Sequence, residues 1–182
     1  MDTQNKEILI TKSDISKSND LILSVEQLNV VIGKTPAKAK KVRPAKGGGQ
    51  WTYVSGSYMK KQLNILFGWN WDFEIINEQI LLDAGEVVVK GKLTCRSGGQ
   101  TIVKMQYGNK DIMFRKGTKI PLSIGNDLKA AATDSLKKCA AEIGIAQDVY
   151  APADFKDVTV IEDAVVVSEK TNLEKLQANG NV

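Results

Sequence analysis

The chain has 182 residues, of which 42% are hydrophobic and 25% are charged, so it is long enough for one well-buried core and short for two. It has no histidine and only two isolated cysteines, which excludes Ser/His and Cys/His nucleophile pairs and the usual zinc ligand sets. The net charge of +4 is uneven, because residues 151–182 carry six acids and three lysines, a net charge of −3 that leaves +7 for residues 1–150.

No apolar run is long enough to span a bilayer, and the N-terminus has no secretory signal pattern. Two free thiols suit a reducing compartment. We therefore expect a soluble, non-secreted protein of the cytoplasm that has no membrane partner.

Residues 1–46 are predicted to form a flexible N-terminal arm. A short helix is expected near 24–33, because Ser24 and Gln27 have capping-box spacing and Gly33 can end the helix. A basic segment follows with six cations and no acid, among them Arg43 and Lys46, and with prolines that prevent a long helix. This segment is either a solvated linker or an arm that follows a phosphate backbone.

From Trp51 the apolar pattern is tighter. The spacing from Tyr58 to Phe67 predicts a helix that ends at Gly68. A strand should follow, because four apolar side chains alternate with polar ones. These are Trp69, Trp71, Phe73 and Ile75. Aromatic residues can stack on bases, but a regular apolar strand face more often lies in the core, and we interpret all four as core residues.

Two β-rich runs, 87–96 and 101–107, flank Ser97-Gly98-Gly99-Gln100 and predict a hairpin. One face of the first strand is apolar, with Val87, Val89, Leu93 and Cys95. The other face is basic, with Lys90, Lys92 and Arg96, and we place Lys104 on the non-core face of the second strand.

After a looser stretch from Gly108 to Gly125, an amphipathic helix is predicted that begins near Asn126 or Asp127 and contains ATDSLKKCAAEIG, residues 132–144. Lys137 and Lys138 project away from its apolar stripe, either as a solvated face or as phosphate ligands. Beyond Tyr150, residues 158–167 could form a strand and 172–177 a helix. The acidic composition of residues 151–182 suits a mobile tail at least as well.

Motifs for catalysis fail on inspection. GKT at residues 33–35 resembles the end of a phosphate-binding loop, but Leu28 stands where the first glycine is required and Pro36 blocks the helix. Carboxylates are scattered without the spacing of a metal site. We find neither the GxxG loop nor the aromatic RNA-binding pattern of common nucleic-acid modules. What remains is an αβ domain with basic surfaces, which favours binding over chemistry.

Four fragments together resemble the radiation-sensitive fifty-two family of single-strand annealing proteins, especially its short bacterial and phage members. They are GGGQWTYVSG (47–56), LNILFGWNWDFEI (63–75), a hairpin ending in Tyr107-Gly108, and ATDSLKKCAAEIG (132–144). The resemblance covers about residues 47–150. It implies an α+β fold with a β-β-β-α core that assembles into rings or arcs, around which single-stranded DNA lies with its backbone in a positively charged groove and its bases outward.

The resemblance also implies DNA-binding residues. Lys137 and Lys138 occupy the place of the basic pair in the family's TDGLKRA-like motif. The family arginine after the YxxG stretch is replaced by Tyr58, and either Lys60 or Lys61 could substitute for it. Further candidates are Arg43, Lys46, Lys90, Lys92, Arg96 and Lys104. The tail is too short for the recombinase-binding extension of the long eukaryotic members.

The sequence thus predicts ATP-independent binding of single-stranded DNA and annealing of complementary strands in recombination and repair, in the cytoplasm of a bacterial host. No catalytic residue, metal or cofactor is expected. The expected partners are single-stranded DNA, further copies of the chain and, through the acidic tail, a single-strand-binding or replication protein. The alternatives are a passive single-strand coating protein and a metal-dependent nuclease.

Overall fold

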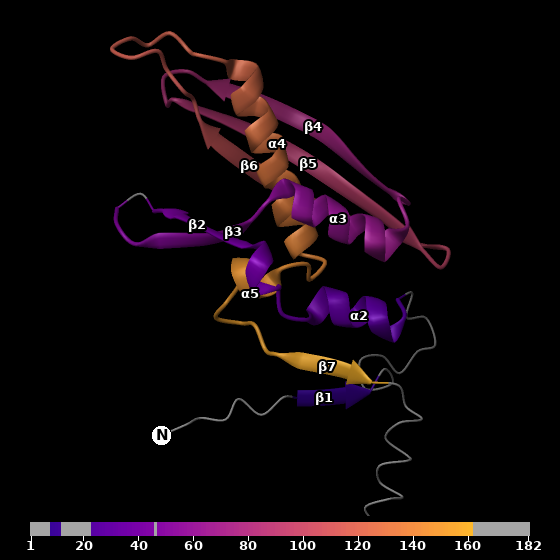
Figure 1. Cartoon of the computed structure of the whole chain (residues 1–182). Coiled ribbons are helices and arrows are strands. Elements are labelled where there is room, and N and C mark those ends of the chain that lie inside the picture. The colour runs from indigo at the N-terminus through magenta and orange to yellow at the C-terminus, as the bar shows by residue number, and fades with distance from the viewer. Residues whose placement is uncertain (1–7, 12–22, 46, 162–182) are drawn as a thin grey trace, which may run out of the picture.

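The computed structural model describes residues 8–11, 23–45 and 47–161 (Figure 1). In chain order the elements are β1 (Ile8–Thr11), α2 (Val25–Ile32), the 3-10 turn η1 (Ala37–Ala39), β2 (Lys40–Pro44), β3 (Gln50–Val54), α3 (Gly56–Phe67), β4 (Trp71–Leu81), β5 (Glu86–Ser97), β6 (Gln100–Asp111), α4 (Ile124–Ala141), α5 (Gln147–Tyr150) and β7 (Val158–Ile161). The strands form three groups: the antiparallel sheet β4-β5-β6, the hairpin β2-β3 and the parallel pair β1-β7. The α+β prediction is confirmed.

The sheet and α4 form the β-β-β-α unit at the centre of the fold. Two glycines let the helix approach the strands closely. A Cβ atom on Gly108 would lie 2.2 Å from the carbonyl oxygen of Ala131, and one on Gly91 would lie 2.5 Å from the hydroxyl of Ser135. That hydroxyl donates a hydrogen bond to the carbonyl oxygen of Gln106 at 2.8 Å. The helix is thus fixed to β6 by a polar contact as well as by packing.

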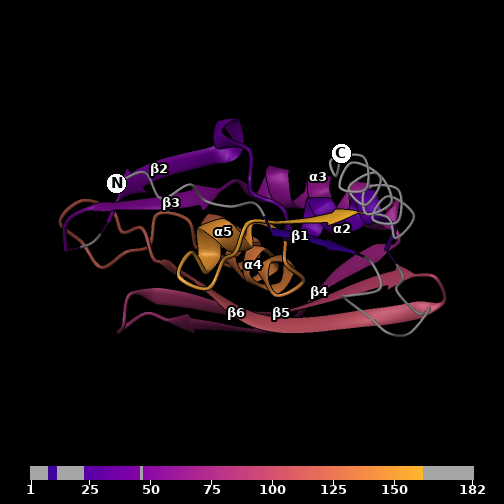
Figure 2. The same cartoon turned by 90° about the horizontal axis from the view of Figure 1, so that it is seen from below.

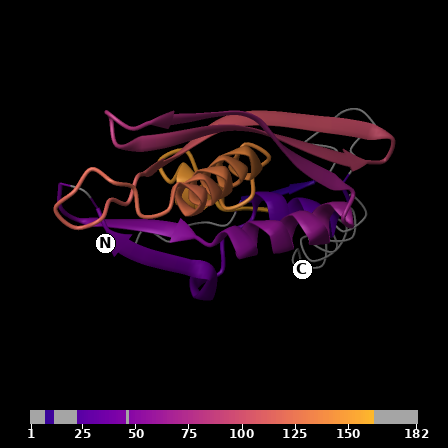
Figure 3. The same cartoon turned by 90° about the horizontal axis from the view of Figure 1, so that it is seen from above.

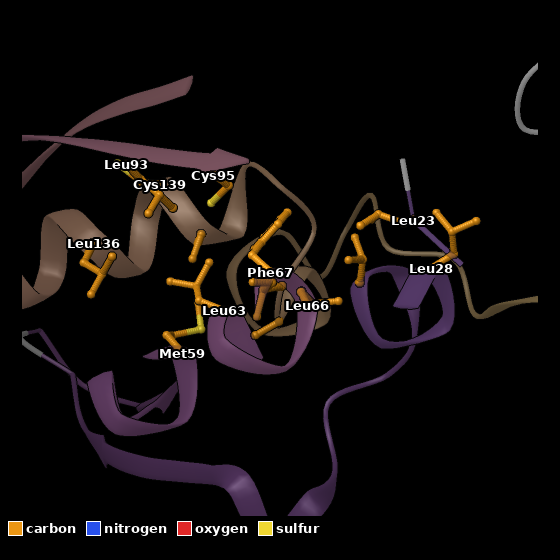
Figure 4. Close-up of a cluster of buried hydrophobic side chains, with 14 of the residues drawn as sticks. Leu23, Leu28, Met59, Leu63, Leu66, Phe67, Leu93, Cys95, Leu136 and Cys139 are labelled. Carbon is orange, nitrogen blue, oxygen red and sulfur yellow. The ribbon is translucent and has the colours of Figure 1, made fainter. Parts of the chain in front are cut away.

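Helix α4 lies between two layers. The sheet covers one side, and α3 with the β2-β3 hairpin lies on the other (Figures 2 and 3). Apolar residues of α3, β5 and α4 meet in the core between them (Figure 4). They include Met59, Leu63 and Leu66 of α3, Leu93 and Cys95 of β5, and Leu136 and Cys139 of α4. Burial raises the pKa of the Cys95 thiol to about 12, so it remains a protonated packing residue.

Helix ends fall where the sequence places them. The side chain of Ser24 accepts from the backbone of Gln27 while the Gln27 side chain accepts from the backbone of Ser24, which completes the capping box of α2. Gly68 ends α3 in the left-handed conformation that glycine adopts at low cost. Helix α4 begins at Ile124, two residues before the predicted start near Asn126, and ends at Ala141, before the predicted end at Gly144.

The interpretation of the aromatic strand is wrong at two of its four residues. Trp71 and Phe73 pack against the core. Trp69 is 77% exposed, because it precedes β4 in a positive-φ conformation that points it away from the strand face. Ile75 is also exposed, at the point where a register shift interrupts the pairing of β4 with β5.

Two segments expected to be irregular form strands, and a third, for which a strand and a mobile tail were both open, forms the strand β7. Residues 40–44, interpreted as a linker or an arm, pair with β3, and Gly47–Gly49 form the turn between them. Strands β1 and β7 pair in parallel, and the amide of Asn29 bonds both the N–H and the C=O of Val160 at 2.8 and 2.9 Å. The predictions for Lys46 and for residues 162–182 lie outside the described residues.

Across the described ranges, none of the helices is both long enough and apolar enough to cross a membrane.

Candidate nucleic-acid interface

One face of the β2-β3 hairpin combines cations and aromatic rings. Lys41 pairs with Tyr53 and Arg43 with Trp51, and residues that oppose each other in an antiparallel pair project to the same side. The guanidinium of Arg43 lies 5.7 Å from the centre of the Tyr53 ring. Trp51 is 59% exposed. We call Lys41, Arg43, Trp51 and Tyr53 the hairpin face; this combination suits phosphates and stacked bases.

The second candidate surface is the α4 face, defined as Asp134, Lys137 and Lys138. Asp134 pairs with both lysines, at 3.5 Å to Lys137 and 3.1 Å to Lys138. The Lys137 side chain is only 16% exposed. A lysine on the open side of a surface helix would be more exposed, but α4 is covered on two sides by the layers around it. The α4 face therefore carries a net charge of +1, and its lysines are held in place by an acid.

Tyr150 ends α5, a helix that contacts both β3 of the hairpin and α4. Burial raises the pKa of its hydroxyl, the charge of Asp134 raises the pKa further, and the charge of Arg43 lowers it. The hairpin face and the α4 face thus act electrostatically on the same side chain. Figure 1 shows the hairpin at the level of the C-terminal half of α4, with its tip pointing away from the helix.

The loop between β6 and α4 carries cations that the sequence analysis missed. Phe114 bridges to Pro121, and the N–H of Arg115 donates to the carbonyl oxygen of Ile120 at 2.9 Å. Its tip exposes Arg115, Lys116 and Lys119. The loop projects on the same side as the β2-β3 hairpin (Figures 1–3). The turn signal RKGTK, with basic residues around a glycine, could have identified it.

The sheet surface that faces away from α4 is less available for phosphates than predicted. Lys92 pairs with Glu74 at 3.3 Å, and Arg96 pairs with Asp72 at 2.6 Å. The ammonium of Lys90 lies 5.5 Å from the centre of the Tyr107 ring. The cations are on the predicted face, but neighbouring strands supply partners that the sequence of a single hairpin could not reveal.

Three other predicted residues lie outside the α4 face. Lys104 opposes Leu93, so it projects to the helix-covered side of the sheet, and its placement on the non-core face is wrong. Lys60 and Lys61 are exposed on α3, whose buried stripe contains Met59 and Leu63. Because this stripe faces α4, the two lysines project away from it.

A model of the Rad52/22 family, described as double-strand break repair protein, matches residues 26–164. The chain belongs to this family. Membership places it among proteins of DNA repair and recombination that bind DNA and form oligomers. The family match includes strand β2 and all of α2 except its first residue, both of which lie outside the motif resemblance over residues 47–150. A comparison with curated proteins finds no match.

The family match covers the hairpin face and the α4 face alike. Within residues 8–11, 23–45 and 47–161, no group of three or more acids or cysteines is placed to hold a metal ion. The chemistry that these surfaces offer is reversible attraction of anions and contact with flat rings.

Proposed function

We propose that this chain binds single-stranded DNA through its phosphate backbone and anneals complementary strands without nucleotide hydrolysis. The observation that carries the proposal is that α5 joins the β2-β3 hairpin to α4, so that one chain of the Rad52/22 family holds the hairpin face and the α4 face around the same short helix. The hairpin supplies the cations Lys41 and Arg43, and α4 supplies Lys137 and Lys138.

The chemistry of annealing favours this arrangement. A strand that is held by its phosphates keeps its base edges free to test a second strand, and phosphate contacts do not depend on base sequence. Duplex formation supplies the favourable free energy, so no phosphate-binding loop is needed. Lysine and arginine also release counterions from the strand, which makes the binding dependent on salt.

Assembly of several copies would repeat this surface along one strand. Edge strand β4 supports such assembly, because it exposes apolar side chains that a monomer leaves in water. They are Ile75, Ile76, Ile80 and Leu81, each 40–53% exposed.

The test is an annealing assay with two complementary labelled oligonucleotides, run without ATP. We expect the protein to accelerate pairing of complementary strands and to leave non-complementary strands unpaired. Binding without acceleration would instead favour the passive coating protein. Strand cleavage on addition of Mg²⁺ would favour the nuclease. Electron microscopy of the same sample reports whether multimers are present.

A further inference from the structure

A buried carboxylate stands at the base of the β2-β3 hairpin. The Asp148 side chain of α5 is only 4% exposed. The hydroxyl of Thr35 donates to one of its oxygens at 2.5 Å, and the ammonium of Lys40 lies 2.7 Å from the other. Both partners come from the segment that leads into the hairpin, more than a hundred residues earlier in the chain.

The local electrostatics keep this carboxylate charged. Burial by itself raises the pKa of Asp148, but hydrogen bonds from Lys40 and Thr35 and the charge of Lys40 outweigh burial and hold the pKa below its ordinary value of 3.8. Its charge reaches Tyr58 as well, whose pKa is raised first by burial and then by Asp148. A buried charge held by one hydrogen bond and one ion pair is costly to displace, so the group resists rearrangement.

The partners of Asp148 lie at both ends of one short segment. Thr35 precedes η1, and Lys40 is the first residue of β2, so one carboxylate fixes both ends of the turn that starts the hairpin. Lys40 opposes Val54, the fully buried last residue of β3. An isolated two-stranded hairpin is marginal in water, so its orientation depends on contacts at this base.

We propose that Asp148 is a positioning residue: through Thr35 and Lys40 it sets the orientation of the hairpin face beside the α4 face, and thereby the affinity for single-stranded DNA, without touching the DNA. This inference rests on the proposed function. The hairpin residues that would meet DNA, such as Arg43, are distinct from the residues that orient them.

Two variants test the inference. Asp148→Asn removes the charge at nearly constant shape, and Thr35→Val removes one hydroxyl and changes no charge. We expect each to weaken binding of a labelled oligothymidine about threefold to tenfold, because only a fraction of molecules then holds the hairpin correctly. The slope of log affinity against log salt should not change, since no phosphate contact is lost.

The sign of the charge effect separates positioning from electrostatics. Asp148→Asn removes a negative charge, which by itself would tighten DNA binding. The matched control is Asp154→Asn, which removes the same charge from an exposed position nearby in the chain. We expect unchanged or slightly tighter binding for the control and weaker binding for Asp148→Asn.

Hydrogen exchange of the full chain without DNA provides a readout that does not depend on the proposed function. In both variants the amides of residues 40–54 should exchange faster, while those of β5 and α4 keep the protection of the parent. Unchanged exchange together with unchanged affinity overturns the inference. A reduced salt slope in Thr35→Val, or faster exchange across the whole chain in both variants, also overturns it. If the parent does not anneal DNA but residues 40–54 exchange faster in both variants, the proposed function is refuted, while the role of Asp148 in orienting the hairpin stands.

Discussion

Asp134 decides what the lysine pair of α4 can do. It holds both ammonium groups within 3.5 Å, and an arriving phosphate must compete with it. Lys138 and Asp134 are partly exposed, so their ion pair contributes little to stability, at most about 1 kcal/mol. The Lys137 side chain is only 16% exposed, so its removal also loses packing of its methylene chain, and thermal unfolding of the variant has to be measured beside its DNA binding.

The double variant Lys137→Ala, Lys138→Ala tests the DNA-binding role of the pair. Each lost phosphate contact should lower the salt slope of single-strand binding by about 0.7, in every subunit of a multimer, and similarly for unrelated DNA sequences. Fluorescence anisotropy over a series of salt concentrations measures the slope. Asp134→Asn is the matched control and should tighten binding, because it frees both lysines. A double variant that binds and anneals like the parent would show that the lysines only solvate the helix.

Asp148 also makes a pH prediction at the scale of one residue. Its pKa is lower in the folded state than its ordinary 3.8, so its contribution to stability is present above pH 3.8 and is lost as the pH falls through the folded value. Urea unfolding at a series of pH values between about 5 and 2 should show a smaller loss of stability for Asp148→Asn than for the parent. Equal losses would mean that the carboxylate titrates as it does in the unfolded chain.

Among the elements, the contact of α4 with β6 depends on Gly108. Gly108→Ala would place a methyl group against the backbone of Ala131 and Ser135, where nothing can move aside without shifting the helix. We expect a loss of at least about 1–3 kcal/mol in the free energy of unfolding. Gly125→Ala is the control on the same helix, because its new methyl group meets open space and alanine favours helix. Thermal unfolding compares the two, and a neutral Gly108→Ala would contradict the close packing.

The edge strand β4 carries the prediction for assembly. Ile80 is 44% exposed, and Ile80→Lys would place a charge where a neighbouring copy should bury an apolar side chain, at a cost of about 1.5–3 kcal/mol per interface. Sedimentation velocity should then show smaller species than the parent. Gln79→Lys adds the same charge to the adjacent exposed polar position and should retain the parent's multimers. Equal assembly of all three proteins would exclude this part of β4 as an interface.

At the scale of the whole molecule, the structure moves the boundary of the dispensable tail. The sequence placed this boundary after Tyr150, but β7 lies beyond it, and Val160 is 1% exposed in the core. Strands β1 and β7 and helix α2 depend on each other through the Asn29 contacts. The tail to be tested is therefore residues 162–182, which carry four acids and two lysines.

We expect truncation after Ile161 to retain the fold and to leave DNA binding unchanged or slightly tighter, since the removed segment has a net charge of −2 that repels DNA. Truncation after Tyr150 should instead lower the melting temperature, because it removes β7. Circular dichroism and anisotropy measure both effects. Lost binding in a folded protein that ends at Ile161 would show that the tail takes part in DNA binding. If the parent pulls down a single-strand-binding protein and the chain that ends at Ile161 does not, the tail binds that partner.

The sequence by itself determined the elements whose signals are local. Examples are the capping box at Ser24, the helix end at Gly68 and the Gly98-Gly99 turn. Each signal acts within a few residues, so it can be recognised in the sequence without knowledge of the tertiary structure. The apolar faces of β5 and α4 follow from periodicity, and the ordered fragments were enough to identify the family.

Only the tertiary structure decided which cations are available and which segments pair. Lys92 and Arg96 meet acids of β4, Lys104 follows the register of β6 to the helix-covered side, and Lys40 meets Asp148 across the fold. The β1-β7 pair joins residues 8–11, which carried no strand signal, to part of the strand expected in residues 158–167, whose partner the sequence did not identify. These contacts depend on residues far apart in sequence, and a charge or a strand edge has a partner only after folding brings one to it.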